Sequence, residues 1–316
     1  MKKLSPQHTA TLPGAVEQSR VTARQGVFYG LAAYLVWGMF PVYFKALAGA
    51  TPLEIVCHRV VWSAALLLVI VGGSRQLGKL WNLVRNPAKL LVLCGSTLLI
   101  SANWFIFLYA VERGDVLQSS LGYFITPLIS VLLGCLVLRE RLSPLQMISV
   151  GCAAAGVLTL TLYQGQLPLI ALSLGFSFGT YGLLRKMADI EALVGLTVET
   201  LLLTPLCLAY LLFLFFRGDG AFGGDALQLN LLLPLAGAVT VIPLLLFVGA
   251  ARRVRLATVG FLQYITPTMH FILAVGLYRE PFSHTRLLSF VFIWMGLLLY
   301  SWDALATSVR LKKTAG

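Results

Sequence analysis

The chain alternates between long apolar runs and short polar segments. A helix that spans a membrane needs about 20 consecutive, mostly apolar residues. Ten runs meet this requirement, so the pattern predicts an all-α integral membrane protein with ten transmembrane helices. The runs lie at roughly 26–47, 54–72, 88–111, 116–138, 145–163, 166–185, 193–216, 228–251, 256–278 and 284–304.

The polar segments between and beside these runs have different characters. Residues 1–25 lack an apolar core and a cleavage site, so we expect a disordered cytoplasmic tail rather than a signal peptide. Residues 305–316 are expected to form a second cytoplasmic tail. The connection 73–87 is amphipathic and predicts a short segment on the membrane surface, whereas 217–227 is a turn region rich in Gly and Asp.

The overall composition supports a membrane protein. Hydrophobic residues make up 58% of the 316 residues and charged residues only 11%, whereas a soluble domain carries about 25% charged residues. A soluble fold of this size has no way to bury so much apolar surface. We therefore expect the lipid bilayer to surround most of the chain.

The positive charge is distributed unevenly between the two sides. With the N-terminus in the cytoplasm, 18 of the 24 Lys and Arg fall on the cytoplasmic side and four on the other, with Lys45 and Arg59 inside spans. Cytoplasmic loops of membrane proteins carry such an excess. The pattern predicts both termini in the cytoplasm, and it explains the net charge of +12 by orientation rather than by nucleic-acid binding.

The second half of the chain repeats the first at an offset of about 140 residues. Ile125-Thr126-Pro127 aligns with Ile265-Thr266-Pro267, Arg139-Glu140 with Arg279-Glu280, and Gly156 with Gly296. The units are 26–163 and 166–304, each of five helices. Because five is odd, the second unit enters the membrane from the opposite side, which predicts two inverted repeats of the kind that secondary transporters use. A packed bundle built by duplication, as in some channels, is the alternative.

Two prolines stand in equivalent apolar settings. Pro127 and Pro267 each remove a helical hydrogen bond, which frees the carbonyl of Tyr123 in one repeat and of Gln263 in the other. Helix breakers at matching places in two halves point to a transport site near the midplane. We therefore expect both kinks to face the interface between the repeats and to take part in coupling or gating.

Few ionisable groups lie inside the predicted spans, and each is a functional candidate because its burial is costly. His58 and Arg59 lie in the second span, and Glu199 lies at a similar depth in the seventh. One hypothesis places Arg59 on the anionic part of a solute and a coupling proton on Glu199 or His58. The alternative is a structural Arg59–Glu199 ion pair. His270, near mid-span, is either a gating residue or a packed histidine.

A second group of candidates is polar or aromatic and lies near the middle of the predicted spans. Aromatic walls with a few polar groups suit a small organic solute, although Tyr and Trp also mark membrane interfaces and Asn and Gln also link helices. These substrate-binding candidates are Trp62, Asn103, Trp104, Tyr123, Tyr181, Gln263 and Tyr264.

The sequence lacks the motifs that would indicate other chemistry. HExxH, a phosphate-binding loop and clustered carboxylates with metal-ligand spacing are all absent, so we expect no cofactor, no metal and no enzyme activity. The five cysteines lie inside apolar runs and are interpreted as packing residues. Energy would then come from a gradient of protons, other ions or the solute itself.

Several stretches resemble a known family. They are "RQGVFYGLAAYLVWGMFPVYFKAL" at 24–47, "EIVCHRVVWS" at 54–63, "SLGYFITPLISVLLG" at 120–134 and "FLQYITPTMHFILAV" at 261–275. With them the chain resembles the drug/metabolite transporter superfamily, in its EamA-type ten-helix branch and RarD group. The resemblance implies a bacterial inner-membrane exporter of small organic metabolites.

Together the patterns predict a secondary transporter that works by alternating access. Net positive charge inside the spans favours an anionic or zwitterionic solute, such as an amino acid. A sensor or accessory subunit of the membrane is one alternative. A membrane enzyme acting on lipid-linked substrates is another, although it would need an acid/base pair that the spans do not supply.

Overall fold

A computed structural model of the chain describes residues 13–112, 116–164, 169–277, 279 and 284–313, and in these ranges all regular structure is helical. The longer helices are α1 (Pro13–Gly38), α3 (Pro52–Gly73), α5 (Pro87–Glu112), α6 (Val116–Leu136), α7 (Pro144–Gln164), α8 (Leu169–Met187), α9 (Ala192–Arg217), α10 (Leu227–Arg253) and α13 (His284–Lys313). The shorter ones are α2 (Phe40–Ala46), α4 (Leu77–Val84), α11 (Leu256–Gln263), α12 (Ile265–Ile272) and a π-helical turn at Leu273–Leu277.

Each of the ten predicted spans coincides with helical structure, with α1 and α2 sharing the first run and α11, α12 and the π-helical turn sharing the ninth. Eight of these helical stretches in the described chain are long and apolar enough to cross a bilayer. The other two are α6, whose apolar stretch is Leu121–Leu136, and α8, which ends in Arg185 and Lys186. The chain is therefore a multi-pass membrane protein, and the crossings of α6 and α8 remain predictions.

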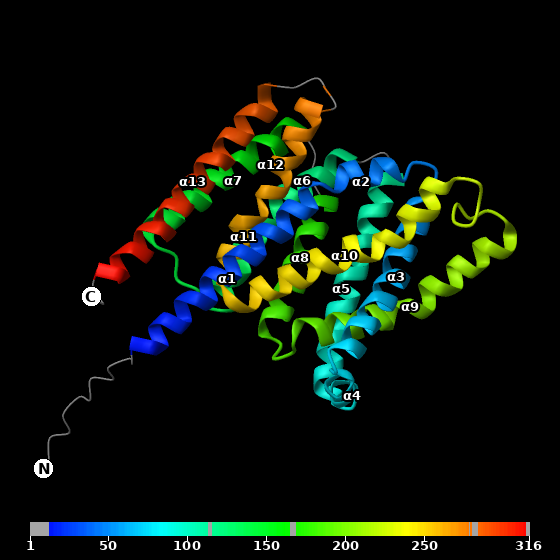
Figure 1. Cartoon of the computed structure of the whole chain (residues 1–316). Helices are drawn as coiled ribbons and strands as arrows, with labels where there is room; N and C mark the ends of the chain where they lie inside the picture. Colours follow the sequence, from blue (N-terminus) through cyan, green and yellow to red (C-terminus); the bar gives the residue numbers. More distant parts are fainter. Residues whose placement is uncertain (1–12, 113–115, 165–168, 278, 280–283, 314–316) are drawn as a thin grey trace, which may run out of the picture.

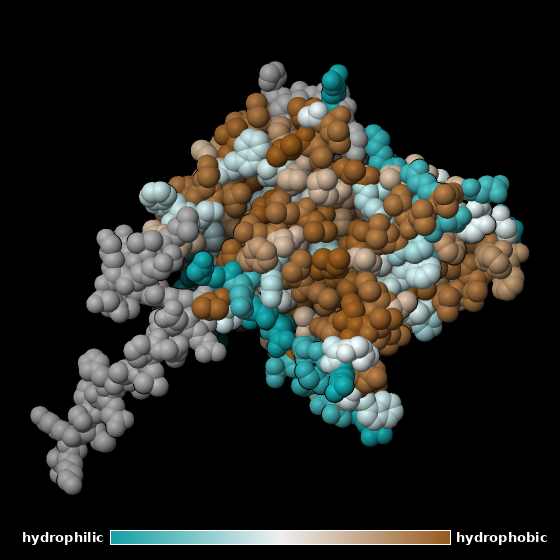
Figure 2. Space-filling view, viewed as in Figure 1, coloured by the Kyte–Doolittle hydropathy of each residue, from teal (hydrophilic) through white to brown (hydrophobic). Residues whose placement is uncertain are grey.

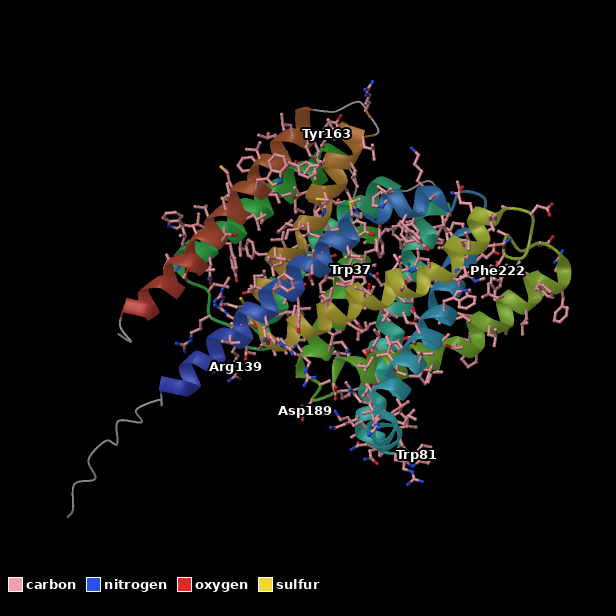
Figure 3. The ribbon with its side chains drawn as sticks, viewed as in Figure 1. Trp37, Trp81, Arg139, Tyr163, Asp189 and Phe222 are labelled. Carbon is pink, nitrogen blue, oxygen red and sulfur yellow. The ribbon has the colours of Figure 1, made fainter. Side chains whose placement is uncertain are left out.

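The helices run between two ends of one bundle (Figure 1). The start of α1, the end of α13 and α4 lie towards one end, and Figure 3 shows Trp81 and Asp189 at that end. Tyr163 and Phe222 lie at the other. We call these the Asp189 end and the Phe222 end. Since α1 starts and α13 finishes on the same side, the chain crosses the bundle an even number of times.

The surface between the two ends is apolar. Figure 2 shows hydrophobic side chains across the middle of the visible face, with hydrophilic ones near its edges. Large apolar side chains are strongly exposed there and elsewhere, among them Phe216 (82%), Leu206 (74%) and Leu91 (73%). Contiguous apolar surface on this scale would aggregate in water, so it is the surface that faces lipid.

The first and last helices extend beyond the predicted spans into the segments where tails are expected. Helix α1 begins at Pro13, inside the range 1–25 where a tail is expected, and α13 continues to Lys313. Residues 1–12 and 314–316 lie outside the described residues. The amphipathic connection forms α4, whose Leu80 and Leu83 pack against Ile190 and Val194 at the Asp189 end.

Helices from the two halves of the chain pack in matching pairs. Equivalent helices pack on each other in three pairs, α3 with α9, α6 with α11, and α7 with α13. The α7–α13 contact is reciprocal at the level of single atoms. A Cβ on Gly156 would lie 2.7 Å from the Ser289 carbonyl oxygen, and a Cβ on Gly296 would lie 2.7 Å from the Ser149 carbonyl oxygen. Only glycine lets the two backbones approach this closely.

The helices that contain the two equivalent prolines, Pro127 and Pro267, differ in detail. Helix α6 continues through Pro127, where the Thr126 hydroxyl donates to the Gly122 carbonyl at 2.6 Å. In the second half of the chain, the equivalent helix is interrupted at Tyr264, between α11 and α12. There the Thr266 hydroxyl donates to the Tyr34 carbonyl of α1 at 3.0 Å. The helix of the second half is therefore interrupted before its proline, whereas α6 is continuous through Pro127.

Candidate functional site

A cavity of about 320 Å³ lies among the helices of both halves, with walls from α1, α2, α3, α5, α6, α8, α10, α11 and α12. Figure 3 places Trp37, one of its wall residues, near the centre of the bundle. The volume is within the range of small-molecule sites. Six predicted residues line this cavity, namely Arg59, Asn103, Trp104, Tyr123, Gln263 and His270.

Arg59 is the charged group of the cavity wall. Its Nε donates to Thr240 Oγ1 of α10 at 3.0 Å. The close approach of α3 and α10 makes this contact feasible, because a Cβ on Gly237 would lie 2.5 Å from the Trp62 carbonyl carbon. In the same approach Ser63 Oγ donates to the Gly237 carbonyl at 3.2 Å. The glycine therefore brings Thr240 within reach of the guanidinium.

The rest of the Arg59 guanidinium faces aromatic rings. Its central carbon lies 5.0 Å from the Trp104 ring centre, 5.6 Å from that of Phe44 and 5.9 Å from that of Phe40. Such contacts stabilise a cation without neutralising it. Among the described residues, no carboxylate lines the cavity or lies within ion-pair distance of Arg59. The cavity therefore presents a positive charge to whatever enters it.

Neutral polar groups complete the wall. Asn103 Nδ2 donates to the Leu174 carbonyl and to Ser177 Oγ, both at 2.9 Å, which ties α5 to α8 and turns the amide to the cavity. Gln263 is 7% exposed, and its Oε1 has no hydrogen-bond partner among the described groups. Tyr123 and Gln263, whose carbonyls the two prolines were expected to free, both line the cavity, and the orientation of the kinks toward a repeat interface stays a prediction.

His270 lies at the edge of the same wall. Its Nε2 is 3.3 Å from the Trp37 carbonyl oxygen, and its ring meets that of Tyr123 edge-on with 5.6 Å between centres. The residue thus connects α12, α6 and α1 across the cavity. Because it lies on α12 and contacts α6, the two helices that carry the equivalent prolines, it stays a candidate for gating.

Much of the aromatic wall was not predicted. Trp37 meets Phe178 edge-on at 5.8 Å, and Tyr34, Phe40 and Phe44 add further ring surface. Aromatic residues are 11% of the chain and occur in nearly every span. The sequence gives no signal that separates those facing the cavity from those facing lipid.

Four of the predicted substrate-binding residues, His58, Trp62, Tyr181 and Tyr264, do not line the cavity. His58 Nδ1 accepts from Trp62 Nε1 at 3.2 Å, and both rings pack on Phe222 of the connection after α9. Tyr181 is fully buried, and Tyr264 is 1% exposed. Their surroundings fit packing at the Phe222 end or in the core better than contact with a solute.

The alternative of an Arg59–Glu199 ion pair is wrong. Glu199 Oε1 lies 3.6 Å from Arg185 Nη1 of α8, and Glu199 also accepts from Ser96 Oγ and, at 3.4 Å, from the Tyr181 hydroxyl. The sequence placed Arg185 among the cytoplasmic charges because it stands beside Lys186 at the end of a span. It is in fact 1% exposed, because its side chain lies against the first turn of α9, where a Cβ on Gly195 would overlap the guanidinium and the Ala192 carbonyl lies 3.5 Å from Nη2.

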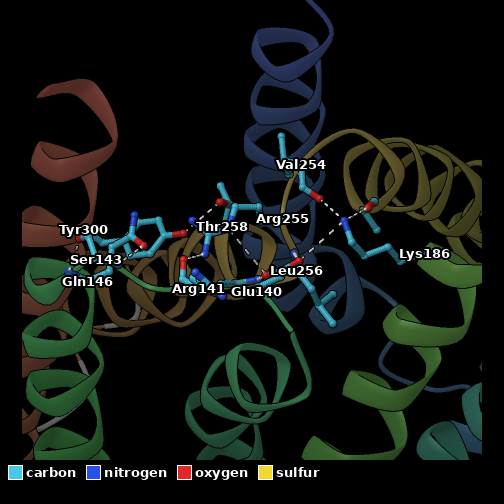
Figure 4. A network of polar contacts seen from close by, with 12 residues as sticks. Glu140, Arg141, Ser143, Gln146, Lys186, Val254, Arg255, Leu256, Thr258 and Tyr300 are labelled. Carbon is cyan, nitrogen blue, oxygen red and sulfur yellow. Dashed lines mark hydrogen bonds and ion pairs between the residues drawn. The ribbon is translucent and has the colours of Figure 1, made fainter. Parts of the chain in front are cut away.

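The Asp189 end of the bundle is closed by a polar network (Figure 4). Glu140, after α6, accepts from the backbone N–H groups of Leu256 at 2.7 Å and Ala257 at 3.0 Å at the start of α11. Its carboxylate also lies 4.0 Å from Lys186 Nζ and from Arg255 Nε. A carboxylate at a helix start is stabilised by the helix dipole as well as by these donors.

Two further contacts extend this network. Lys186 Nζ donates to the carbonyls of Ala251, at 3.0 Å, and Val254, so the lysine joins α8 to α10 instead of extending to the membrane surface. Ser143 Oγ donates to Asp303 Oδ2 of α13 at 2.8 Å. The Lys186 contacts join two helices of the second half, and the Ser143 contact joins the first half of the chain to the second.

Comparisons with known proteins agree with this architecture. Residues 24–162 match the family model of the EamA-like transporter family. The chain is 45% identical over 284 residues to Protein RarD of Salmonella typhi, covering 90% of this chain and 97% of that one. It is 44% identical over 283 residues to an uncharacterized transporter of Vibrio cholerae, covering 90% and 94%. One crystal structure shares the fold with a TM-score of 0.66 at 17% identity, covering 87% of this chain and 96% of that one.

Proposed function

Because the chain belongs to the EamA-like transporter family, alongside relatives named RarD, we propose that it is a secondary transporter for small organic anions or zwitterions. It works by alternating access between the two ends of the bundle. Members of this family are transporters and not enzymes, so the alternative of a membrane enzyme for lipid-linked substrates is set aside.

The architecture of the proposed transporter is a pair of inverted five-helix repeats. The reciprocal contacts of Gly156 and Gly296 support it, because such a contact arises when a twofold axis relates two surfaces. Arg139 and Arg279, equivalent in the two halves, also share a left-handed backbone, with φ of 53° and 52°. Side chains avoid this conformation, so its recurrence favours two copies of one unit.

The solute class follows from Arg59, and this observation carries the proposal. An arginine held in an aromatic cavity without a carboxylate partner favours a ligand with a negative group. The rings of Trp37, Phe178 and Phe40 offer apolar surface to the rest of that ligand. We therefore expect carboxylates or amino acids with an aromatic or apolar body to be carried.

The network around Glu140 supports alternating access. It joins α6, α8, α10 and α11 at the Asp189 end, so a solute in the cavity reaches that side only after these contacts break. The excess of Lys and Arg favours the Asp189 end as the cytoplasmic one in a bacterial inner membrane. Export is the direction that the resemblance to drug/metabolite transporters implies.

The test is solute flux by the purified chain in proteoliposomes. Three probes share a phenyl body and differ in charge, namely phenylpyruvate, phenylalanine and benzyltrimethylammonium. We expect flux of the anion or the zwitterion and none of the cation. Arg59→Ala abolishes that flux and Arg59→Lys retains part of it, whereas Arg217→Ala, at the exposed last residue of α9, leaves it unchanged.

Two outcomes would overturn the proposal. Flux of the cation in preference to the anion would remove Arg59 as the recognition group. The absence of flux for every small anion and zwitterion tried, with folded protein, would favour the sensor or accessory role. Because the chain is assayed alone, a requirement for another subunit would also become visible.

A further inference from the structure

Glu199 is a carboxyl group inside the membrane that the solute cavity does not use. It lies in the second turn of α9, counted from the Asp189 end, and it is 2% exposed. At a rise of about 1.5 Å per residue, the helix carries it roughly 10 Å past its first residue. An ionisable group at such a depth is costly to keep and is a functional candidate by default.

Three donors from two other helices point at this carboxyl group. Ser96 Oγ of α5 donates to Oε1, and the Tyr181 hydroxyl of α8 lies 3.4 Å from Oε2. Arg185 Nη1 of α8 lies 3.6 Å from Oε1. These donors favour the ionised form of the carboxyl group, which burial opposes.

Arg185 is incompletely satisfied in this arrangement. It is 1% exposed, yet its Nε and Nη1 have no hydrogen-bond partner among the described groups, and its Nη2 reaches the Ala192 carbonyl only at 3.5 Å. A buried ion pair that serves stability alone requires good geometry and satisfied donors. This pair has neither, which suggests an arrangement that changes during the working cycle.

A small cavity with Glu199 in its wall lies beside the solute cavity and shares the wall residues Ile100, Trp104 and Leu244 with it. Its volume of about 20 Å³ is enough for about one water molecule. Ser63, Thr200 and Thr240 line it together with Glu199, which gives a water the polar partners that it needs. Trp104 belongs to the walls of both cavities, and Thr240 also accepts from Arg59. One water can therefore pass a proton between the solute site and Glu199.

We propose that Glu199 is the proton-binding site of the transporter, with Arg185 as its counter-ion, an inference that rests on the proposed transport function. A protonated water in the small cavity gives its proton to a carboxylate oxygen of Glu199 and becomes neutral water. Arg185 keeps its charge throughout. Release is the reverse transfer, after the bundle has opened to the other side.

Proton binding and anion binding favour each other in this geometry. A neutral Glu199 leaves the charge of Arg185 uncompensated, and an anion on Arg59 supplies a negative charge to the same region. Among the described residues, the charged or titratable groups that face Glu199 are Arg185 and Tyr181, both from α8. The expected transport step therefore moves a proton and an anion together, so export of the anion is driven by its own outward gradient and carries the proton outward with it.

The first test measures protonation directly. Infrared difference spectra of the purified full chain are recorded as the pH is lowered, and the C=O stretch of a buried carboxylic acid is followed. We expect a band in the wild type that is lost in Glu199→Gln and kept in Glu191→Gln, whose carboxylate is exposed and paired with Lys79. A wild type without a band dependent on Glu199 would overturn the inference.

The second test measures coupling in proteoliposomes that contain a trapped pH dye. We expect phenylpyruvate flux by the wild type to change the lumenal pH. Glu199→Gln retains exchange of labelled for unlabelled phenylpyruvate and loses the pH change. Should that variant misfold, Ser96→Ala keeps the carboxylate but removes one of its donors, so the infrared midpoint rises by about one pH unit; an unchanged midpoint would count against the proposal.

The transport proposal and the proton-binding role of Glu199 can be overturned independently. A wild type that carries phenylpyruvate without moving protons overturns the role of Glu199 and leaves the transport proposal standing. A wild type that carries none of the probes overturns the transport proposal, and the infrared titration still decides whether Glu199 binds a proton.

Discussion

Arg59 of α3 and Thr240 of α10 are joined by a hydrogen bond of 3.0 Å from Nε to Oγ1. The two helices belong to different halves of the chain, so the bond crosses the interface at which the cavity forms. It leaves the two terminal nitrogens of the guanidinium to the cavity. The position of the recognition group therefore depends on a residue of the other half.

Thr240→Val tests this dependence. Valine keeps the shape of threonine but removes the acceptor, so Arg59 loses the bond that fixes its orientation. A hydrogen bond to a charged group is worth about 1.5–3 kcal/mol, so we expect the KM for phenylpyruvate to rise about tenfold with a smaller effect on kcat. Thr159→Val is the matched control, since its hydroxyl bonds only the Ala155 carbonyl of its own helix. Equal KM values in both variants would exclude the role of Thr240.

Gln263→Glu tests the electrostatic basis of solute selection. The substitution is isosteric, and it places a carboxylate at a buried amide whose Oε1 is without a partner. The new charge offsets that of Arg59 in a low-dielectric cavity. We expect phenylpyruvate affinity to fall at least about tenfold and benzyltrimethylammonium to become a better ligand. Gln228→Glu, with the same change of net charge outside the cavity, should leave both unchanged.

Glu140→Gln tests the closure of the Asp189 end. Glutamine keeps one acceptor but loses the charge that faces Lys186, Arg255 and the start of α11. We expect the open state of this end to become about tenfold more populated, since about 1.4 kcal/mol corresponds to a factor of ten.

The reporter is a cysteine introduced at Ser130, which is 4% exposed on the closed side of the cavity. Maleimide labelling from the Asp189 side should be about tenfold faster in the Glu140→Gln background. Glu191→Gln, which removes an exposed ion pair at the same end, should leave the rate unchanged. Equal labelling rates in the two backgrounds would mean that the network does not hold this end closed.

Gly156→Ala and Gly296→Ala test the reciprocal contact between α7 and α13. Each new methyl group would lie 2.7 Å from a backbone carbonyl oxygen of the facing helix. Overpacking of this kind costs about 1–3 kcal/mol, so we expect both variants to lower Tm in detergent by similar amounts. Gly151→Ala, on the same helix but facing open space, should not lower it. A loss in only one of the two variants would contradict the twofold relation.

The sequence predicted the parts of this protein that depend on hydrophobicity and on rare residues. The spans follow from the length of apolar runs, and Arg59, Asn103, Tyr123, Gln263 and His270 stand out because polar groups in such runs are few. All five line one cavity. A polar group inside a span is unfavourable in contact with lipid, so it lies where protein or a cavity surrounds it.

The prediction failed where a residue type is common or stands at the end of a span. The ring surface of the cavity is made of aromatic residues like those that face lipid elsewhere, so pattern alone does not separate them. Arg185 looks like a loop charge beside Lys186, and only the structure shows that its side chain is buried against the start of α9, beside Glu199. Both errors concern the direction in which a side chain points.

Helices α7 and α13 pack on each other through Gly156 and Gly296, yet neither contributes a residue to the described walls of the solute cavity. Among the described residues, the first four spans of the first half and three spans of the second half line the cavity, whereas α7 and α13 join the two halves. Substitutions in α7 and α13 should change the abundance and heat resistance of the protein and leave its solute preference constant. An engineer who wishes to change what is carried has no reason to touch these two helices, and one who wishes to harden the protein has reason to begin there.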